Sequence, residues 1–235
     1  MNKRGAHLIA LDLDGTLEDS RADMIASVHR VRAAFKLAPK TDDAFFGQVN
    51  RGMETLYRSC FSELFEGDTV ELFEGDTVDE KALLQTLTRA YETDYSAHIA
   101  DQTRLYDGMA EALEELRLLG HLAIVTNKPE SLSTLLLDKL EVRSHFQAII
   151  GGDTCAESKP SAVPYGEAAR RCAFDPAQGQ AFMIGDTAGD IACGRAFGAL
   201  TIWCAWGYTD EPGANEPHFR ASHPLELPAL IRAHL

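Results

Sequence analysis

Four short apolar runs, each ending abruptly in polar residues, constrain the fold of this chain more than any other feature. They read HLIALDLD (residues 7–14), HLAIVTN (121–127), FQAIIGGD (146–153) and AFMIGD (181–186). Their apolar residues are nearly continuous and do not alternate with polar ones, which is typical of strands covered on both faces in a parallel sheet. The runs therefore predict four neighbouring strands of a buried sheet.

Helical patterns separate these runs along the second half of the chain. Leucines at helical spacing mark residues 109–120 and 129–141, and further helical patterns cover residues 161–174 and 188–199. Alternation of strand and helix favours right-handed crossover connections and a doubly wound α/β fold. In such sheets ligands bind beyond the carboxyl ends of the strands, so we expect a site there.

The segment from Glu18 to His98 interrupts this alternation because it contains consecutive helical patterns. We interpret residues 18–98 as a separate helical domain inserted into a core formed by residues 1–17 and 99–235. Within the insertion the octapeptide ELFEGDTV occurs twice in succession, over residues 63–70 and 71–78. A loop extension between two helices is the favoured interpretation; an acidic lid and a copying artefact are the alternatives.

Composition excludes several classes of protein. With a net charge of −14 and no cluster of basic residues, the chain lacks the positive face that nucleic acid or anionic lipid would require. No apolar stretch approaches the ~20 residues of a membrane span, and no cleavable leader pattern follows the first residues, so we expect a cytoplasmic protein. The five widely spaced cysteines, with no CxxC, argue against disulfides and a zinc site.

Acidic residues at the predicted strand ends are suited to phosphoryl transfer. Asp12 could attack phosphorus and form an aspartyl-phosphate, but a carboxylate and a phosphate repel each other, so positive charge is needed. Asp186 and Asp190 could join Asp12 in holding Mg²⁺, a cation that prefers oxygen ligands. Lys159 could add an ammonium group near the phosphoryl oxygens.

Four further residues near these strand ends have candidate roles. Asp14 could donate a proton to the departing oxygen and later accept one from the attacking water. The hydroxyl of Thr126 could orient the phosphoryl group, with help from Asn127. Gly15 permits a tight turn that brings backbone N–H groups close to an anion.

Taken singly, each of these residues also has a structural explanation. An aspartate at a strand end or Thr126 could cap a helix, with about even odds against a site. Lys159 alone is more often a solvated lysine, and Asp190 alone could be a first-turn acid favoured by the helix dipole. Their ordered recurrence at strand ends and helix starts favours a common site.

The motifs DLDGTLEDS, IVTN, SKP and GDTAGD, in this order, resemble those of the haloacid dehalogenase superfamily of phosphohydrolases. The stretches LYDGMAEALEELRLLGHLAIVTNKP and WGYTDE are similar to the phosphoglycolate phosphatase-like branch, which has a helical cap inserted after the first motif. This resemblance implies a Rossmann-like core and agrees with the helical insertion inferred above.

The resemblance also implies roles for individual residues. Asp12 would be the nucleophile and Asp14 the acid/base, while Thr126 and Lys159 would hold the phosphoryl group. The ligands of Mg²⁺ would be Asp12, Asp186 and the carbonyl of Asp14, with Asp190 supporting the metal through its waters or from the second shell. In the cap, Arg51 of FFGQVNRGMETLY is a candidate for binding a second anionic group of the substrate.

The sequence thus predicts a Mg²⁺-dependent phosphatase of small phosphorylated metabolites, with 2-phosphoglycolate as a candidate substrate and a monomer or homodimer as the expected assembly. A phosphomutase or a phosphonate-cleaving enzyme is the alternative within the superfamily. A carbon–halogen hydrolase is disfavoured, because a departing halide needs no proton and such relatives lack the second acid. A phospho-accepting receiver and a non-catalytic binding protein remain as alternatives of another class.

Overall fold

The chain folds into two compact units. In the computed structural model, residues 7–48, 52–65, 70–73 and 76–235 are described, with only the backbone described for residues 70–73 and 76–78. The core unit comprises Met1–Asp19 and Arg104–Leu235, and the helical unit comprises Ser20–Thr103.

A parallel sheet forms the centre of the core unit. Among the described residues it has six strands in the order β10-β9-β8-β1-β6-β7, and each neighbouring pair is parallel. The strands are β1 (Leu8–Leu11), β6 (His121–Val125), β7 (Phe146–Ile150), β8 (Ala181–Gly185), β9 (Leu200–Cys204) and β10 (Phe219–Ala221). Leu11 of β1 is in register with Ile124 of β6 and Ile184 of β8, so these three strands end at one edge.

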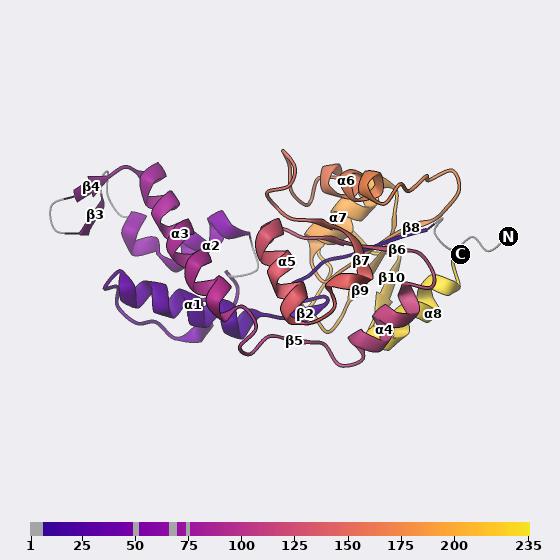
Figure 1. Cartoon of the computed structure of the whole chain (residues 1–235), viewed down its shortest axis with the longest axis horizontal. Coiled ribbons are helices and arrows are strands. Elements are labelled where there is room, and N and C mark those ends of the chain that lie inside the picture. Colours follow the sequence, from indigo (N-terminus) through magenta and orange to yellow (C-terminus); the bar gives the residue numbers. More distant parts are fainter. Residues whose placement is uncertain (1–6, 49–51, 66–69, 74–75) are drawn as a thin grey trace. The chain divides into compact units, whose positions relative to one another are not determined.

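Helices cover both faces of this sheet. They are α4 (Met109–Leu116), α5 (Glu130–Lys139), α6 (Val163–Arg171), α7 (Ala188–Phe197) and α8 (Leu227–Arg232). In the view of Figure 1, α6 lies above the strands, whereas α4 and α8 lie below them. Leu8 and Ala10 of β1 pack in one apolar cluster with Tyr165 and Ala168 of α6. Ile9 and Leu11, on the other face, are equally buried.

The predicted doubly wound sheet is confirmed, and its near-continuous apolar strands are explained by burial on both faces. The sheet extends beyond β8 through β9 and β10, which the sequence pattern did not predict. A short antiparallel pair was not predicted either: in β2 (Glu18–Asp19) and β5 (Arg104–Leu105), Glu18 pairs with Leu105. This pair joins the two segments of chain that lead into and out of the helical unit.

The helical unit contains the helices α1 (Arg21–Ala34), α2 (Met53–Cys60) and α3 (Glu80–His98). Short 3₁₀ helices cover Asp42–Ala44 and Ser62–Phe65. Buried apolar side chains from α2 and α3 form much of its interior, and Tyr91 stacks on Tyr95 with ring centroids 5.6 Å apart. The helices expected in the insertion are therefore present.

The repeated octapeptide does not form a featureless loop. The described residues include an antiparallel pair, β3 (Val70–Phe73) and β4 (Asp76–Val78), in which Val70 aligns with Val78. The insertion is therefore not purely helical, because the strands use Val70 of the first copy and the Phe, Thr and Val of the second copy, which are residue types that favour strands. Residues 66–69 and 74–75 of the repeat lie outside the described residues.

A buried arginine links three segments of the helical unit. The Nη2 atom of Arg32 donates to Ala38 O over 2.7 Å and to Glu63 Oε1 over 2.7 Å, and its Nη1 atom donates to Cys60 O. The Arg32 side chain is 2% exposed, whereas that of Glu63 is one-third exposed. The cation is thus held by groups of the chain itself.

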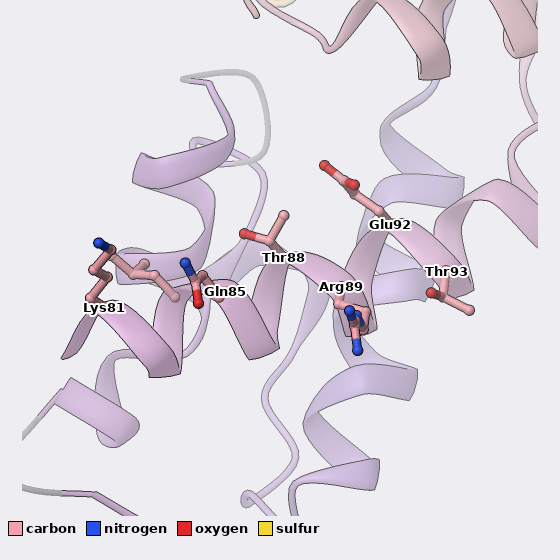
Figure 2. Close-up of a pocket in the computed structure, with 7 residues that line it drawn as sticks. Lys81, Gln85, Thr88, Arg89, Glu92 and Thr93 are labelled. Atoms are coloured by element: carbon pink, nitrogen blue, oxygen red, sulfur yellow. The ribbon is translucent and has the colours of Figure 1, made fainter. Parts of the chain in front are cut away.

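A surface pocket of the helical unit runs along one face of α3. Figure 2 shows the polar side chains of Lys81, Gln85, Thr88, Arg89 and Glu92 along this face. None of the acids named as candidate ligands is among them. Among the described helices, none combines the length and apolar composition that a membrane span requires.

Candidate active site

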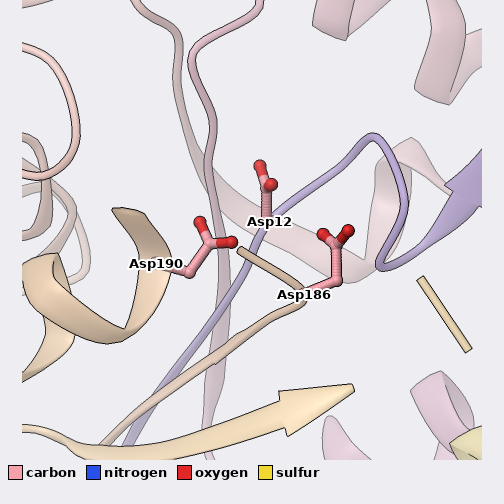
Figure 3. A group of neighbouring side chains, drawn as sticks. All are labelled: Asp12, Asp186 and Asp190. Atoms are coloured by element: carbon pink, nitrogen blue, oxygen red, sulfur yellow. The ribbon is translucent and has the colours of Figure 1, made fainter. Parts of the chain in front are cut away.

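Three carboxylates meet at the edge of the sheet where β1 and β8 end. Asp12 follows β1, Asp186 follows β8, and Asp190 lies in the first turn of α7. Their ligand oxygens lie within 4.8 Å of one another, and all three residues are buried. Figure 3 shows the three side chains converging from these elements. The structure therefore brings together the three acids that the sequence predicts as side-chain metal ligands.

Two glycines lie so close to the side chain of Asp186 that any larger residue in their place would clash with it. Gly15 has φ of +83°, and a Cβ atom there would lie 2.6 Å from Asp186 Oδ2. A Cβ atom at Gly207 would lie 2.2 Å from the Cβ of Asp186. The N–H of Gly15 donates to Glu18 O over 2.9 Å, so this residue shapes the turn and its own N–H is not directed at an anion.

Donors from two loops fix the position of Asp186. Thr16 Oγ1 donates to Oδ1 over 3.0 Å, and the N–H of Tyr208 donates to Oδ2 over 2.7 Å. The indole N–H of Trp203 donates to the carbonyl of Asp186 over 2.9 Å. The indole N–H of Trp206 donates to the carbonyl of Thr16 over 3.0 Å. The two tryptophans, which showed no pattern in the sequence, thus support the acidic loops.

Lys159 supplies the positive charge at this cluster. Its Nζ atom lies 2.7 Å from Asp12 Oδ1 and 2.5 Å from Asp190 Oδ1, and the residue is buried. The side chain of Asn127 bonds to the backbone of Lys159 at both ends: its Nδ2 donates to the carbonyl over 3.2 Å, and its Oδ1 accepts from the N–H over 3.1 Å. Asn127 therefore anchors the loop that carries Lys159, and its help in orienting the phosphoryl group stays a prediction.

Thr126 directly follows β6 and is buried. It precedes Asn127, which binds the loop that carries Lys159. Its N–H donates to Ile150 O over 2.9 Å, which continues the pairing of β6 with β7. Its Oγ1 accepts from the N–H of Lys128 over 3.2 Å. Thr126 is thus located at the same strand edge as Asp12, and its hydroxyl also fixes the chain that follows.

Lys128 is a further residue of this region that was not predicted from the sequence. Its Nζ atom lies 2.6 Å from Asp14 Oδ1, with side-chain exposures of 3% and 14%. The signal in the sequence was its place directly after Thr126 and Asn127, but the following proline suggested only the start of a helix. Glu18, which is fully buried, interacts electrostatically with both Asp14 and Lys128.

The pKa values of the cluster reflect its excess of negative charge. Burial, followed by repulsion from Asp190 and Asp12, raises the pKa of Asp186 to about 8. Burial and Asp190 raise the pKa of Asp12 to about 6, against the opposing effect of Lys159. Burial alone would lower the pKa of Lys159, but the neighbouring carboxylates of Asp12 and Asp190 raise it. One ammonium group therefore does not neutralise the three acids.

This excess charge and the chemistry of the donors fit a hard divalent cation. Carboxylate oxygens are the ligands that Mg²⁺ prefers, and it retains several waters when bound by few protein groups. A bound cation would favour the ionised forms of Asp12 and Asp186, whose proximity is otherwise unfavourable. The remaining candidate, Arg51, lies outside the described residues, so its predicted role was not tested.

Comparisons with known proteins find relatives over most of the chain. The family model for haloacid dehalogenase-like hydrolases matches residues 9–204. A phosphoglycolate phosphatase of Chromobacterium violaceum is 32% identical over 211 residues, which cover 89% of this chain and 90% of the relative. A phosphoglycolate phosphatase of Agrobacterium fabrum is 34% identical over 210 residues, covering 87% of this chain and 83% of the relative.

Solved structures share the fold. The crystal structure of a predicted phosphoglycolate phosphatase from Haemophilus somnus 129PT superposes with a TM-score of 0.81 at 23% sequence identity. The match covers 97% of this chain and 98% of the other. The likeness therefore extends over both the sheet with its helices and the inserted segment.

Proposed function

The chain belongs to the haloacid dehalogenase-like hydrolase family and is a phosphatase, and from this premise we propose that it hydrolyses 2-phosphoglycolate with the help of Mg²⁺. Curated relatives with this name share about a third of its residues over most of both chains. The geometry that carries the proposal is the buried cluster of Asp12, Asp186 and Asp190 with Lys159.

We assign the nucleophile to Asp12. An oxygen of its carboxylate forms a bond to phosphorus while the ester P–O bond breaks, and the electron pair of that bond goes to the departing oxygen. Asp14 donates a proton to this oxygen, so the product leaves as an alcohol. The ammonium of Lys159, 2.7 Å from Asp12 Oδ1, offsets the charge that gathers at the transferring group.

Hydrolysis of the aspartyl-phosphate completes the cycle. Water attacks phosphorus, its proton passes to Asp14, and the bond between phosphorus and the Asp12 oxygen breaks, which restores both carboxyl groups. We assign Thr126 to orienting the phosphoryl oxygens. Mg²⁺, held by Asp12, Asp186 and the carbonyl of Asp14 with Asp190 in support, would reduce the repulsion between carboxylate and phosphate.

Substrate choice is assigned to the helical unit. In relatives of the branch that this sequence resembles, such an insertion selects the substrate, and Arg51 remains the predicted ligand of its second anionic group. The carboxylate of 2-phosphoglycolate is a group of this kind. The five free cysteines support a cytoplasmic location, and a monomer or homodimer remains the expected assembly.

A panel of phosphate esters tests the proposal. Phosphate release is measured with and without Mg²⁺ for 2-phosphoglycolate, sugar phosphates, nucleotides and pyrophosphate, with isomeric products followed in parallel. We expect the highest kcat/KM for 2-phosphoglycolate and loss of turnover in EDTA. A preference for another ester would overturn the assigned substrate, and an isomeric product without phosphate release would indicate a mutase.

A further inference from the structure

A second buried ion pair lies beside the nucleophile, and the mechanism above makes no use of its cation. Lys128 Nζ is 2.6 Å from Asp14 Oδ1, and the two side chains are 3% and 14% exposed. Lys159 contacts Asp12 and Asp190 in a separate pair. Each carboxyl group of the DLD sequence therefore has a lysine of its own.

The backbone of Lys128 is anchored on both sides. Its N–H donates to Thr126 Oγ1 over 3.2 Å, and its carbonyl accepts from the N–H of Gly152 over 3.0 Å. A Cβ atom at Gly151 would lie 2.8 Å from the same carbonyl, so the two loops are in close contact. The ammonium of Lys128 is thus presented from a fixed loop at the end of β6.

A general acid must be held within hydrogen-bond reach of the oxygen that it protonates. Asp14 follows the strand in a turn, and its carboxyl group could rotate about two side-chain bonds if nothing restrained it. A short charge-assisted contact with a buried cation removes much of that freedom. Lys128 lies where such a restraint is needed.

We propose that Lys128 is a positioning residue, which holds the carboxyl group of Asp14 in place for proton transfer to the departing oxygen. The inference rests on the proposed function, because it requires Asp14 to act as the acid. It assigns no contact between Lys128 and the substrate. Its consequence is that loss of Lys128 impairs only those steps in which Asp14 moves a proton.

Two esters with different leaving groups separate these steps. 2-Phosphoglycolate releases an alkoxide, which needs a proton, whereas 4-nitrophenyl phosphate releases a stable phenolate, which does not. In rapid-mixing experiments with Mg²⁺, Lys128→Met should slow phosphorylation by 2-phosphoglycolate about 100-fold. The burst of 4-nitrophenol from the second ester should keep its wild-type rate within about threefold, while its later turnover slows because Asp14 also accepts the proton of water.

Controls identify the origin of the effect. Lys139→Met removes an exposed lysine at the end of α5 and should leave both rates unchanged. Asp14→Asn should show the same selective loss, and adding Lys128→Met to it should cost little more. If Lys128→Met does not fold, Lys128→Arg, which keeps the charge but moves the contacting atom, should again slow the alkyl ester selectively.

Three outcomes would overturn the inference. Equal slowing of both phosphorylation rates would indicate a general structural role, and a raised KM with unchanged rates would indicate that Lys128 binds the substrate. Additive losses in the double variant would show that the two side chains act independently. If the wild-type protein releases phosphate from neither ester, the proposed function itself fails, which is a different result from any of these.

Discussion

The core unit and the helical unit each bury charged side chains, but they do so in different ways. In the helical unit, Arg32 is surrounded by acceptors of the chain, namely Glu63 and the carbonyls of Ala38 and Cys60. In the core unit, three carboxylates converge with Lys159 as their nearest cation. In the first arrangement, acceptors of the protein bind both terminal nitrogens of the cation, whereas the second has an excess of negative charge.

This difference separates charges that hold a structure together from charges that serve chemistry. Leaving a buried charge without compensation costs several kcal/mol, so it persists only where a ligand or the surrounding fold offsets the cost. The hydrogen bond from Arg32 lowers the pKa of Glu63, whereas burial, followed by repulsion between neighbouring carboxylates, raises the pKa values of Asp12 and Asp186. Perturbation in opposite directions is what these two purposes predict.

Removing the nucleophile should have the largest effect. Asp12→Asn should reduce kcat by about 10⁴-fold or more, because it removes the carboxylate that we assign as the nucleophile. Thermal unfolding in EDTA should show no loss of stability, since the change removes one of three mutually repelling acids. The exposed residue Asp138 provides the control Asp138→Asn, which should keep full activity. Retention of more than a tenth of the wild-type rate by Asp12→Asn would refute the assignment.

The corresponding change in the helical unit should affect stability alone. Arg32→Met removes a donor from two carbonyls and one of the two cations that contact Glu63, since Lys40 Nζ stays 2.8 Å from Glu63 Oε1. The change should destabilise this unit by about 3 kcal/mol. Hydrogen exchange followed by mass spectrometry should show faster exchange across residues 20–103 and little change in the sheet of the core. As a control, Arg58→Met removes an exposed arginine and should not change exchange measurably. Faster exchange throughout the chain would contradict the distinction.

The two units should respond to pH in opposite directions. A carboxyl group whose folded pKa is raised makes the folded state less stable as pH rises, so in EDTA the core should lose on the order of 2 kcal/mol between pH 4 and 8. Glu63, whose pKa is lowered, contributes stability above pH 4.5, the ordinary value, and this contribution is lost as pH falls. Hydrogen exchange, corrected for the intrinsic rates at each pH, measures the stability of each unit. If stability changed with pH in the same direction in both units, the prediction would be wrong.

The smallest expected effects are the losses of stability on removing two helix N-caps, one in each unit. Asp79 Oδ1 accepts from the N–H of Ala82 over 2.8 Å at the start of α3, so Asp79→Ala should cost about 1 kcal/mol without changing Mg²⁺ affinity. Thr187 caps α7 and also donates to Asp190 Oδ2 over 2.6 Å. Thr187→Ala should therefore lose similar stability and also weaken Mg²⁺ binding. Unfolding in urea measures the free energy of unfolding, and a titration with Mg²⁺ measures its affinity. Equal Mg²⁺ affinities of the two variants would contradict the prediction for Thr187.

The parts of the fold that the sequence predicted are those determined by local pattern. The nearly continuous apolar runs identified β1, β6, β7 and β8, because burial on both faces leaves few polar positions in a strand. The run LTIWC of β9 is similarly apolar, but no candidate catalytic residue follows it, and it was not predicted as a strand. The three residues of β10 are too few to show a period.

The candidate site was predictable where residue type alone restricts the chemistry. Aspartates at strand ends and Lys159 have few other uses in combination, and the structure places them together. The partners of Lys128 and Trp203 could not be predicted, because Lys128 lies 114 residues from Asp14 and Trp203 bonds to a backbone carbonyl. Such contacts depend on which loops the sheet brings side by side, and no local spacing records that.

The antiparallel pair of β2 and β5 determines how the inserted segment can change during evolution. Asp19 and Arg104 face each other across this ladder, so everything between them leaves and returns at one point. A two-residue turn would suffice to close the hairpin, and the crossover connections of the parallel sheet would be unaffected. Duplication, deletion or exchange of the intervening segment can therefore occur in evolution while the sheet and the residues at its strand ends stay in place.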